Sequence, residues 1–283
     1  MHKPTTRKKR IIIGVAIGVL GIVGAASYVA LHSQTLEPDT LTATLPASSS
    51  GSGGDSEDTS TTSTDKLPSQ ILNLSNWKLT LPISTASGGD AEEIKQPQLA
   101  SYTNASYFFS DSAQDGVVFR ANAGGATTSG SQYPRSELRE MNTNGDEASW
   151  SNANSEHSMT LTEAITAVPR VKPQVVAGQI HDQSDDVIEI RLEDKDLFVQ
   201  ANGKTVGELD ANYVLGTKFA IVVTANPQGI SVSYNGVPKV TYDKIGSGYY
   251  FKAGCYTQSN TAHGDASDAY GEVVIYDLQV KVQ

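Results

Sequence analysis

A succession of short β-type segments separated by turn residues restricts the fold of this chain more than any other feature. The dipeptides Asn202-Gly203 and Asn235-Gly236 are typical of tight hairpin turns. Helical periodicity is weak and confined to 91–102. We therefore predict an all-β fold, an antiparallel β-sandwich of jelly-roll type with a concave groove for a ligand. The expected strands occupy 175–181, 186–193, 196–201, 218–225, 229–235, 248–258 and 272–282.

The N-terminal part of the chain has a different composition. Residues 1–10 carry five basic side chains and no acid, and an uncharged run of 21 residues follows from Ile11 to Leu31. A basic segment before an apolar run of bilayer length directs a chain to export, with the basic end staying inside. We assign residues 1–33 to a transmembrane anchor or a signal segment, and both alternatives remain open.

Two further regions follow this segment. Residues 34–66 are rich in Ser, Thr, Gly and Asp, and such a composition predicts a disordered linker. Residues 67–283 form the predicted folded domain, without a second linker or an internal repeat. We expect this domain to be extracytoplasmic, either membrane-anchored or secreted.

Charge and cysteine content exclude some classes of partner. Beyond residue 10 the chain has 16 basic and 31 acidic side chains, a net charge of −15. Such a body repels nucleic acid and anionic lipid, so we expect no nucleic-acid partner. Cys255 is the only cysteine, which excludes an intramolecular disulfide. We expect a monomer.

Three of the β-type segments place polar side chains on one face, because residues two apart in a strand point the same way. Each segment alone is typical of a solvent-facing strand. Together they supply Arg, Gln, His, Lys and Tyr without a pair of carboxylates for acid–base work, which indicates a groove for an anionic chain. The polar residues are Arg135, Glu137 and Arg139, then Gln179 and His181, then Tyr250, Lys252, Tyr256 and Gln258.

These segments also resemble the signature blocks of a known family. "RSELR" (135–139), "QIH" (179–181) and "YFKAGCYTQ" (250–258) are similar, in order and separation, to three blocks of polysaccharide lyase family 7, the alginate lyases. "NWKLTLPI" (76–83) resembles the start of that family's domain. The resemblance extends over residues 67–283 and implies a β-jelly roll that cleaves the 4-linked uronate chain of alginate by β-elimination, with no cofactor and no metal.

The resemblance assigns roles to individual residues. It implies that Arg135, Gln179 and His181 occupy the neutralising and catalytic positions, and that Tyr256 protonates the leaving oxygen. It places the remaining polar residues in substrate binding or in support of Arg135, namely Glu137, Arg139, Tyr250, Lys252 and Gln258. Ile180, in the middle of the second block, goes with activity on guluronate-containing chains in this family.

Two other functions remain open: a lyase for another polyuronate such as glucuronan, and a non-catalytic module that binds anionic glycans. A pure binder needs cations but no acid–base pair, so His181 and Tyr256 favour an enzyme. Elsewhere we expect His157 and His263 on the surface. We expect residues 182–186 to form a solvated acidic turn and not a calcium site.

Overall fold

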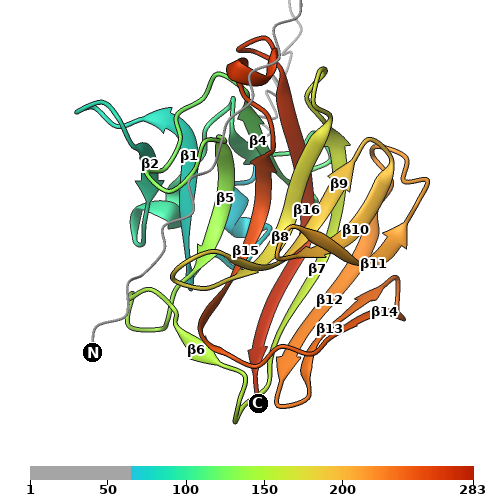
Figure 1. The fold of residues 1–283 in the computed structure, drawn as a ribbon. Coiled ribbons are helices and arrows are strands. Elements are labelled where there is room, and N and C mark those ends of the chain that lie inside the picture. The colour runs from blue at the N-terminus through green and yellow to red at the C-terminus, as the bar shows by residue number, and fades with distance from the viewer. Residues whose placement is uncertain (1–64) are drawn as a thin grey trace, which may run out of the picture. The chain divides into compact units, whose positions relative to one another are not determined.

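The computed structural model describes residues 65–283, which form two antiparallel β-sheets (Figure 1). The predicted anchor or signal segment and nearly all of the predicted linker lie outside the described residues. Within the described range there is no α-helix, and three short 3₁₀ turns cover Pro68–Gln70, Gln98–Ser101 and Thr261–His263. No helix in this range has the length and hydrophobicity needed to cross a lipid bilayer.

The first sheet contains nine strands and carries the polar residues identified in the sequence. Eight of them follow one another in space, and β6 (Trp150–Ser151) pairs with β15 outside this path. The order is β11 (Lys204–Asp210), β10 (Asp196–Ala201), β9 (Asp186–Glu193), β8 (Gln174–His181), β15 (Ser247–Thr257), β5 (Arg135–Glu140), β1 (Trp77–Ser84) and β2 (Ala91–Ile94).

The second sheet has seven strands and covers one face of the first. Its order is β14 (Val237–Tyr242), β13 (Gly229–Tyr234), β12 (Phe219–Asn226), β7 (His157–Ala167), β16 (Tyr270–Val282), β4 (Val117–Asn122) and β3 (Phe108–Ser110). Strands distant in sequence lie next to one another in both sheets, as in a jelly roll. The predicted all-β, antiparallel jelly-roll fold is confirmed.

The hydrophobic core lies between the two sheets. Ile180, Leu138 and Phe251 from the first sheet, and Leu161 and Phe119 from the second, are fully buried there. Because side chains alternate across a strand, the neighbours of these apolar residues in the first sheet point to the opposite face. Burial of the apolar set therefore fixes which side chains face the groove.

The predicted strands agree with the observed ones to within two residues at each end. Asn202 and Gly203 both have positive φ, 50° and 68°, as the expected hairpin turn requires. The weak helical periodicity of 91–102 corresponds to no α-helix, since that segment contains β2 and a 3₁₀ turn. Pro97 in its middle has no N–H to donate and breaks a helical hydrogen-bond ladder.

The expected surface position of His157 was also wrong. His157 is buried, and its ring stacks on Trp150 with 4.2 Å between centroids. It begins β7 in phase with the core residues Met159 and Leu161, which explains its inward direction. His263 is exposed, as expected.

Candidate active site

One row of polar side chains runs across six neighbouring strands of the first sheet, because the strand registers bring its members opposite one another. Adjacent strands lie about 4.8 Å apart, so the row extends over roughly 24 Å. It changes from cationic at β1, β5 and β15 to acidic at β9. Its members, in spatial order, are Lys78, Arg139, Lys252, Gln179, Glu189 and Gln200.

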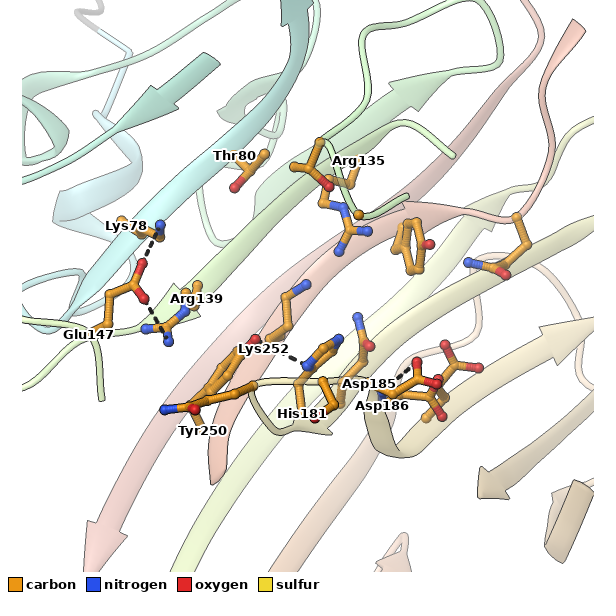
Figure 2. A pocket seen from close by; sticks show the side chains of 18 of the residues that line it. Lys78, Thr80, Arg135, Arg139, Glu147, His181, Asp185, Asp186, Tyr250 and Lys252 are labelled. Atoms are coloured by element: carbon orange, nitrogen blue, oxygen red, sulfur yellow. Dashed lines mark hydrogen bonds and ion pairs between the residues drawn. The ribbon is translucent and has the colours of Figure 1, made fainter. Parts of the chain in front are cut away.

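This row forms the floor of a groove with a volume of about 700 Å³. All of the site residues predicted from the sequence line the groove except Glu137. Figure 2 shows Arg135, Arg139, His181, Tyr250 and Lys252 converging on it from β5, β8 and β15. The sequence analysis missed five charged lining residues, Lys78, Glu93, Glu147, Glu189 and Arg191.

Glu137 lies beneath the groove, where it holds three other site residues. Its side chain is only 2% exposed. Its Oε2 accepts hydrogen bonds from Arg135 Nη1 at 2.8 Å and from Lys252 Nζ at 2.6 Å. Its Oε1 accepts one from Gln179 Nε2 at 2.5 Å. Glu137 therefore positions the guanidinium, the ammonium and the amide together.

Burial and charge have opposing effects on this cluster. Burial disfavours the charged carboxylate of Glu137, but Lys252 and Arg135 outweigh it and lower the pKa of Glu137. Burial also lowers the pKa of Lys252 to about 8, with Glu137 opposing and Arg135 adding to this effect. Near neutral pH the cluster thus holds two cations on one anion, which leaves one net positive charge for a substrate carboxylate.

His181 has the properties of a neutral base. Its Nδ1 lies 2.5 Å from the carbonyl oxygen of Asp182, which can only accept, so Nδ1 carries the proton. The Tyr250 hydroxyl oxygen lies 3.1 Å from the same nitrogen, and the two rings stack (Figure 2). Burial lowers the pKa of His181. The unprotonated Nε2 has no hydrogen-bond partner in the described part of the chain, which leaves its lone pair available.

Tyr256 lies opposite Arg135 in the strand register. The Arg135 guanidinium carbon is 3.8 Å from the centre of the Tyr256 ring. The Tyr256 hydroxyl oxygen lies 2.8 Å from Ser131 Oγ, on the loop before β5. Arg135 and Tyr256 therefore face the groove together, with the guanidinium over the tyrosine ring and the hydroxyl bonded to Ser131.

Gly254 makes this placement possible. Its φ is +139°, and a Cβ built on it would lie 2.6 Å from the Ser136 carbonyl oxygen. The β15–β8 register shifts between Ala253 and Tyr256, while β15 keeps its pairing with β5. A side chain at 254 would prevent this close approach.

The cationic end of the groove is held by a carboxylate from a loop. Glu147 lies 2.8 Å from Lys78 Nζ through Oε1 and 3.2 Å from Arg139 Nη2 through Oε2 (Figure 2). Its side chain is 57% exposed, in contrast to the buried Glu137. At the other end, burial and nearby Asp186 raise the pKa of Glu189 to about 7, against the opposing charge of Arg191.

The acidic segment after β8 forms a turn. Asp182 Oδ1 accepts hydrogen bonds from the backbone N–H groups of Ser184 and Asp185. Within residues 65–283 there is no group of three or more His, Cys, Asp or Glu side chains arranged to hold a metal ion.

The fold and the groove together define a β-sandwich of jelly-roll type whose groove presents cations suited to an anionic chain and contains both His181 and Tyr256. The alginate lyase family model matches residues 72–282. The chain therefore belongs to the alginate lyases of polysaccharide lyase family 7.

Individual relatives agree with this assignment. A solved alginate lyase of polysaccharide lyase family 7 is 54% identical, covers 77% of this chain and 99% of its own, and superposes with a TM-score of 0.74. The alginate lyase from Corynebacterium sp. is 42% identical, with 77% and 98% coverage and a TM-score of 0.73. An alginate lyase from Klebsiella pneumoniae is 28% identical over an alignment of 279 positions, which covers 75% of this chain and 90% of that protein.

Proposed function

We propose that the protein is an alginate lyase that cuts the 4-linked uronate chain by β-elimination and leaves an unsaturated uronate at the new non-reducing end. The observation that supports this most is the neutral His181 in one groove with the Tyr256 hydroxyl and a carboxylate-binding cluster. Family membership supports the same substrate.

The cluster on Glu137 meets the main chemical difficulty of the reaction. The C5 proton of a uronate is weakly acidic beside an ionised carboxylate, so the carboxylate charge needs to be neutralised before the proton leaves. Arg135 and Gln179 are preorganised hydrogen-bond donors held from below by Glu137. Such donors stabilise the enolate-like intermediate without reorganising during the reaction.

His181 and Tyr256 divide the proton transfers according to the sugar. In guluronate the C5 hydrogen lies opposite the leaving O4, so His181 Nε2 takes it and Tyr256 protonates O4. In mannuronate both lie on one side, and the Tyr256 oxygen takes the C5 proton and delivers it to O4. In both cases the C5–H electron pair forms the C4=C5 double bond and the C4–O4 pair leaves with O4.

One assay tests the proposal. The C4=C5 bond beside the carboxylate absorbs in the ultraviolet, so wild-type enzyme on alginate should give rising absorbance. Tyr256→Phe should lower kcat by about 10²–10⁴ with the fold unchanged, because only the hydroxyl is lost. Absorbance with glucuronan and not alginate would favour the other polyuronate lyase. No absorbance with any polyuronate, despite binding, would favour a glycan-binding module.

The preferred block within alginate rests on Ile180. This side chain is fully buried and points away from the groove, so it acts only by placing the strand that carries Gln179 and His181. Small displacements of a base change its rate substantially. We expect higher initial rates on polyguluronate or mixed blocks than on polymannuronate, and a several-fold preference for polymannuronate in the same assay would contradict this.

A further inference from the structure

Ser131 makes three hydrogen-bond contacts with its single hydroxyl group. Its Oγ accepts a hydrogen bond from the Tyr133 backbone N–H at 3.0 Å and lies 3.1 Å from the Tyr133 carbonyl oxygen. The Tyr256 hydroxyl oxygen is the third partner, at 2.8 Å. A serine hydroxyl has one hydrogen and two acceptor lone pairs, so these contacts fill its hydrogen-bonding capacity.

Only one set of directions makes all three contacts hydrogen bonds. The Tyr133 N–H can only donate and the Tyr133 carbonyl can only accept, so in this arrangement the Ser131 hydrogen points to that carbonyl. The remaining lone pair of Ser131 accepts the hydrogen of Tyr256. At rest, neutral Tyr256 therefore donates its proton to Ser131.

The Ser131 hydrogen has a second acceptor within reach once Tyr256 loses its proton. Rotation about the Cβ–Oγ bond moves this hydrogen from the Tyr133 carbonyl to the Tyr256 oxygen, while the Tyr133 N–H stays in place. A hydrogen bond to a charged oxygen is stronger than one to a neutral carbonyl. Ser131 therefore accepts a hydrogen bond from the neutral Tyr256 hydroxyl and donates one to the Tyr256 phenolate.

We infer that Ser131 is a positioning residue that holds the Tyr256 oxygen and stabilises its phenolate form by reversing its hydrogen bond. This inference rests on the proposed lyase function. When Tyr256 gives its proton to O4, the phenolate left behind takes the Ser131 hydrogen bond. His181 later releases its extra proton to solvent, and Tyr256 takes up a proton from solvent. Both residues then return to the resting state. In the mannuronate reaction Tyr256 gives its own proton to O4 as its oxygen takes the C5 proton, and Ser131 holds that oxygen in place.

Ser131→Ala tests the inference, with Ser129→Ala as a matched control. Ser129 is exposed on the same loop and makes no side-chain hydrogen bond to Tyr256 in the described structure. We expect Ser131→Ala to lower kcat at least about tenfold, the value of a hydrogen bond to a charged group, with KM within about twofold. Ser131→Thr, which keeps the hydroxyl, should recover most of the rate. Equal effects of the two alanine variants would overturn the inference.

A double-mutant cycle separates support of Tyr256 from a general effect on the loop. In the Tyr256→Phe background, Ser131→Ala should cause no further loss of residual turnover, because no phenolate remains to be stabilised. A full tenfold loss in that background would assign Ser131 to loop structure alone. If residual turnover is too slow to measure, failure of Ser131→Thr to recover rate in the Tyr256 enzyme is the overturning result.

The controls also distinguish this inference from the proposed function. A wild-type enzyme that gives no unsaturated product contradicts the lyase function itself. An active wild type with an equally active Ser131→Ala contradicts only the role of Ser131. Urea unfolding of each variant shows whether the fold is intact.

Discussion

At the scale of single residues, two carboxylates that contact the site's cations differ in burial: Glu137 lies beneath the groove and Glu147 lies in its lining. Glu137 is buried and cannot leave its partners without abandoning charges in a low-dielectric site. Glu147 is exposed on a loop and can move into water at little cost. A uronate carboxylate that binds Arg139 therefore competes with Glu147, and one that binds Lys78 competes with both Glu147 and Glu93, which lies 2.6 Å from Lys78 Nζ.

We expect Glu147→Gln to lower KM for polyuronate by up to roughly fivefold, the range of an exposed ion pair, with kcat unchanged. Steady-state kinetics at low salt measure this change. Glu193→Gln is the matched control, because Glu193 pairs with Arg191 but does not line the groove. A higher KM for Glu147→Gln would show that Glu147 orients the two cations for substrate instead of competing with it.

At the scale of secondary-structure elements, the irregularity in β15 at Gly254 determines where Tyr256 lies. We expect Gly254→Ala to lower the free energy of unfolding by about 2 kcal/mol or more and kcat by more than about tenfold. An alanine at φ +139° is strained, and its Cβ would press on the β5 backbone. Urea unfolding and steady-state kinetics provide the two numbers.

Gly203→Ala is the control for strain alone. Gly203 also has positive φ, +68°, but a Cβ there would meet nothing within 4 Å. This variant should lose about 1 kcal/mol of stability and no activity. If Gly254→Ala keeps wild-type kcat, the irregularity in β15 at Gly254 does not position Tyr256.

The strands were predictable from the sequence because their apolar residues alternate and their turns use Asn-Gly. The same alternation placed Arg135, Gln179, His181 and Tyr256 on groove-facing positions. Lys78 and Glu189 alternate with buried leucines and isoleucines in the same way, but which strands become neighbours depends on long-range pairing. Ser131 and Glu147 lie on loops, where no strand periodicity predicts which way a side chain points. The burial of Glu137 depends on its partners from two other strands.

At the scale of the whole molecule, an unpartnered carboxyl group in the described core opposes folding. Glu163 on β7 is fully buried between the sheets, and neither carboxylate oxygen has a hydrogen-bond partner among residues 65–283. Burial raises the pKa of Glu163 well above its ordinary value. The folded state therefore binds a proton that the unfolded state releases above about pH 4.5, so stability falls as pH rises from there.

We expect Glu163→Leu to raise the free energy of unfolding at pH 8 by at least about 2 kcal/mol, because it removes an unpaired buried polar group. The gain should be smaller at pH 4.5, where the unfolded state still binds this proton in about half of the molecules. Glu163→Gln should remove the pH dependence of this site and recover less stability than Leu. Urea unfolding at the two pH values measures these changes in the free energy of unfolding. A gain in stability that is the same at both pH values would show that Glu163→Leu acts through packing and not through removal of the charge.

The change of charge along the cross-strand row gives the two fragments of a cut chain different residence times. The fragment over β1, β5 and β15 keeps its carboxylates beside Lys78, Arg139 and Lys252. The fragment toward β9 faces Asp185 and Asp186 and a Glu189 that is paired with Arg191, so we expect it to be held less tightly and to leave sooner. The two product fragments then leave in a fixed order. The fragment toward β9 leaves first, and the fragment over β1, β5 and β15 stays bound long enough to be cut again. Added salt screens both effects and makes the two departures more alike.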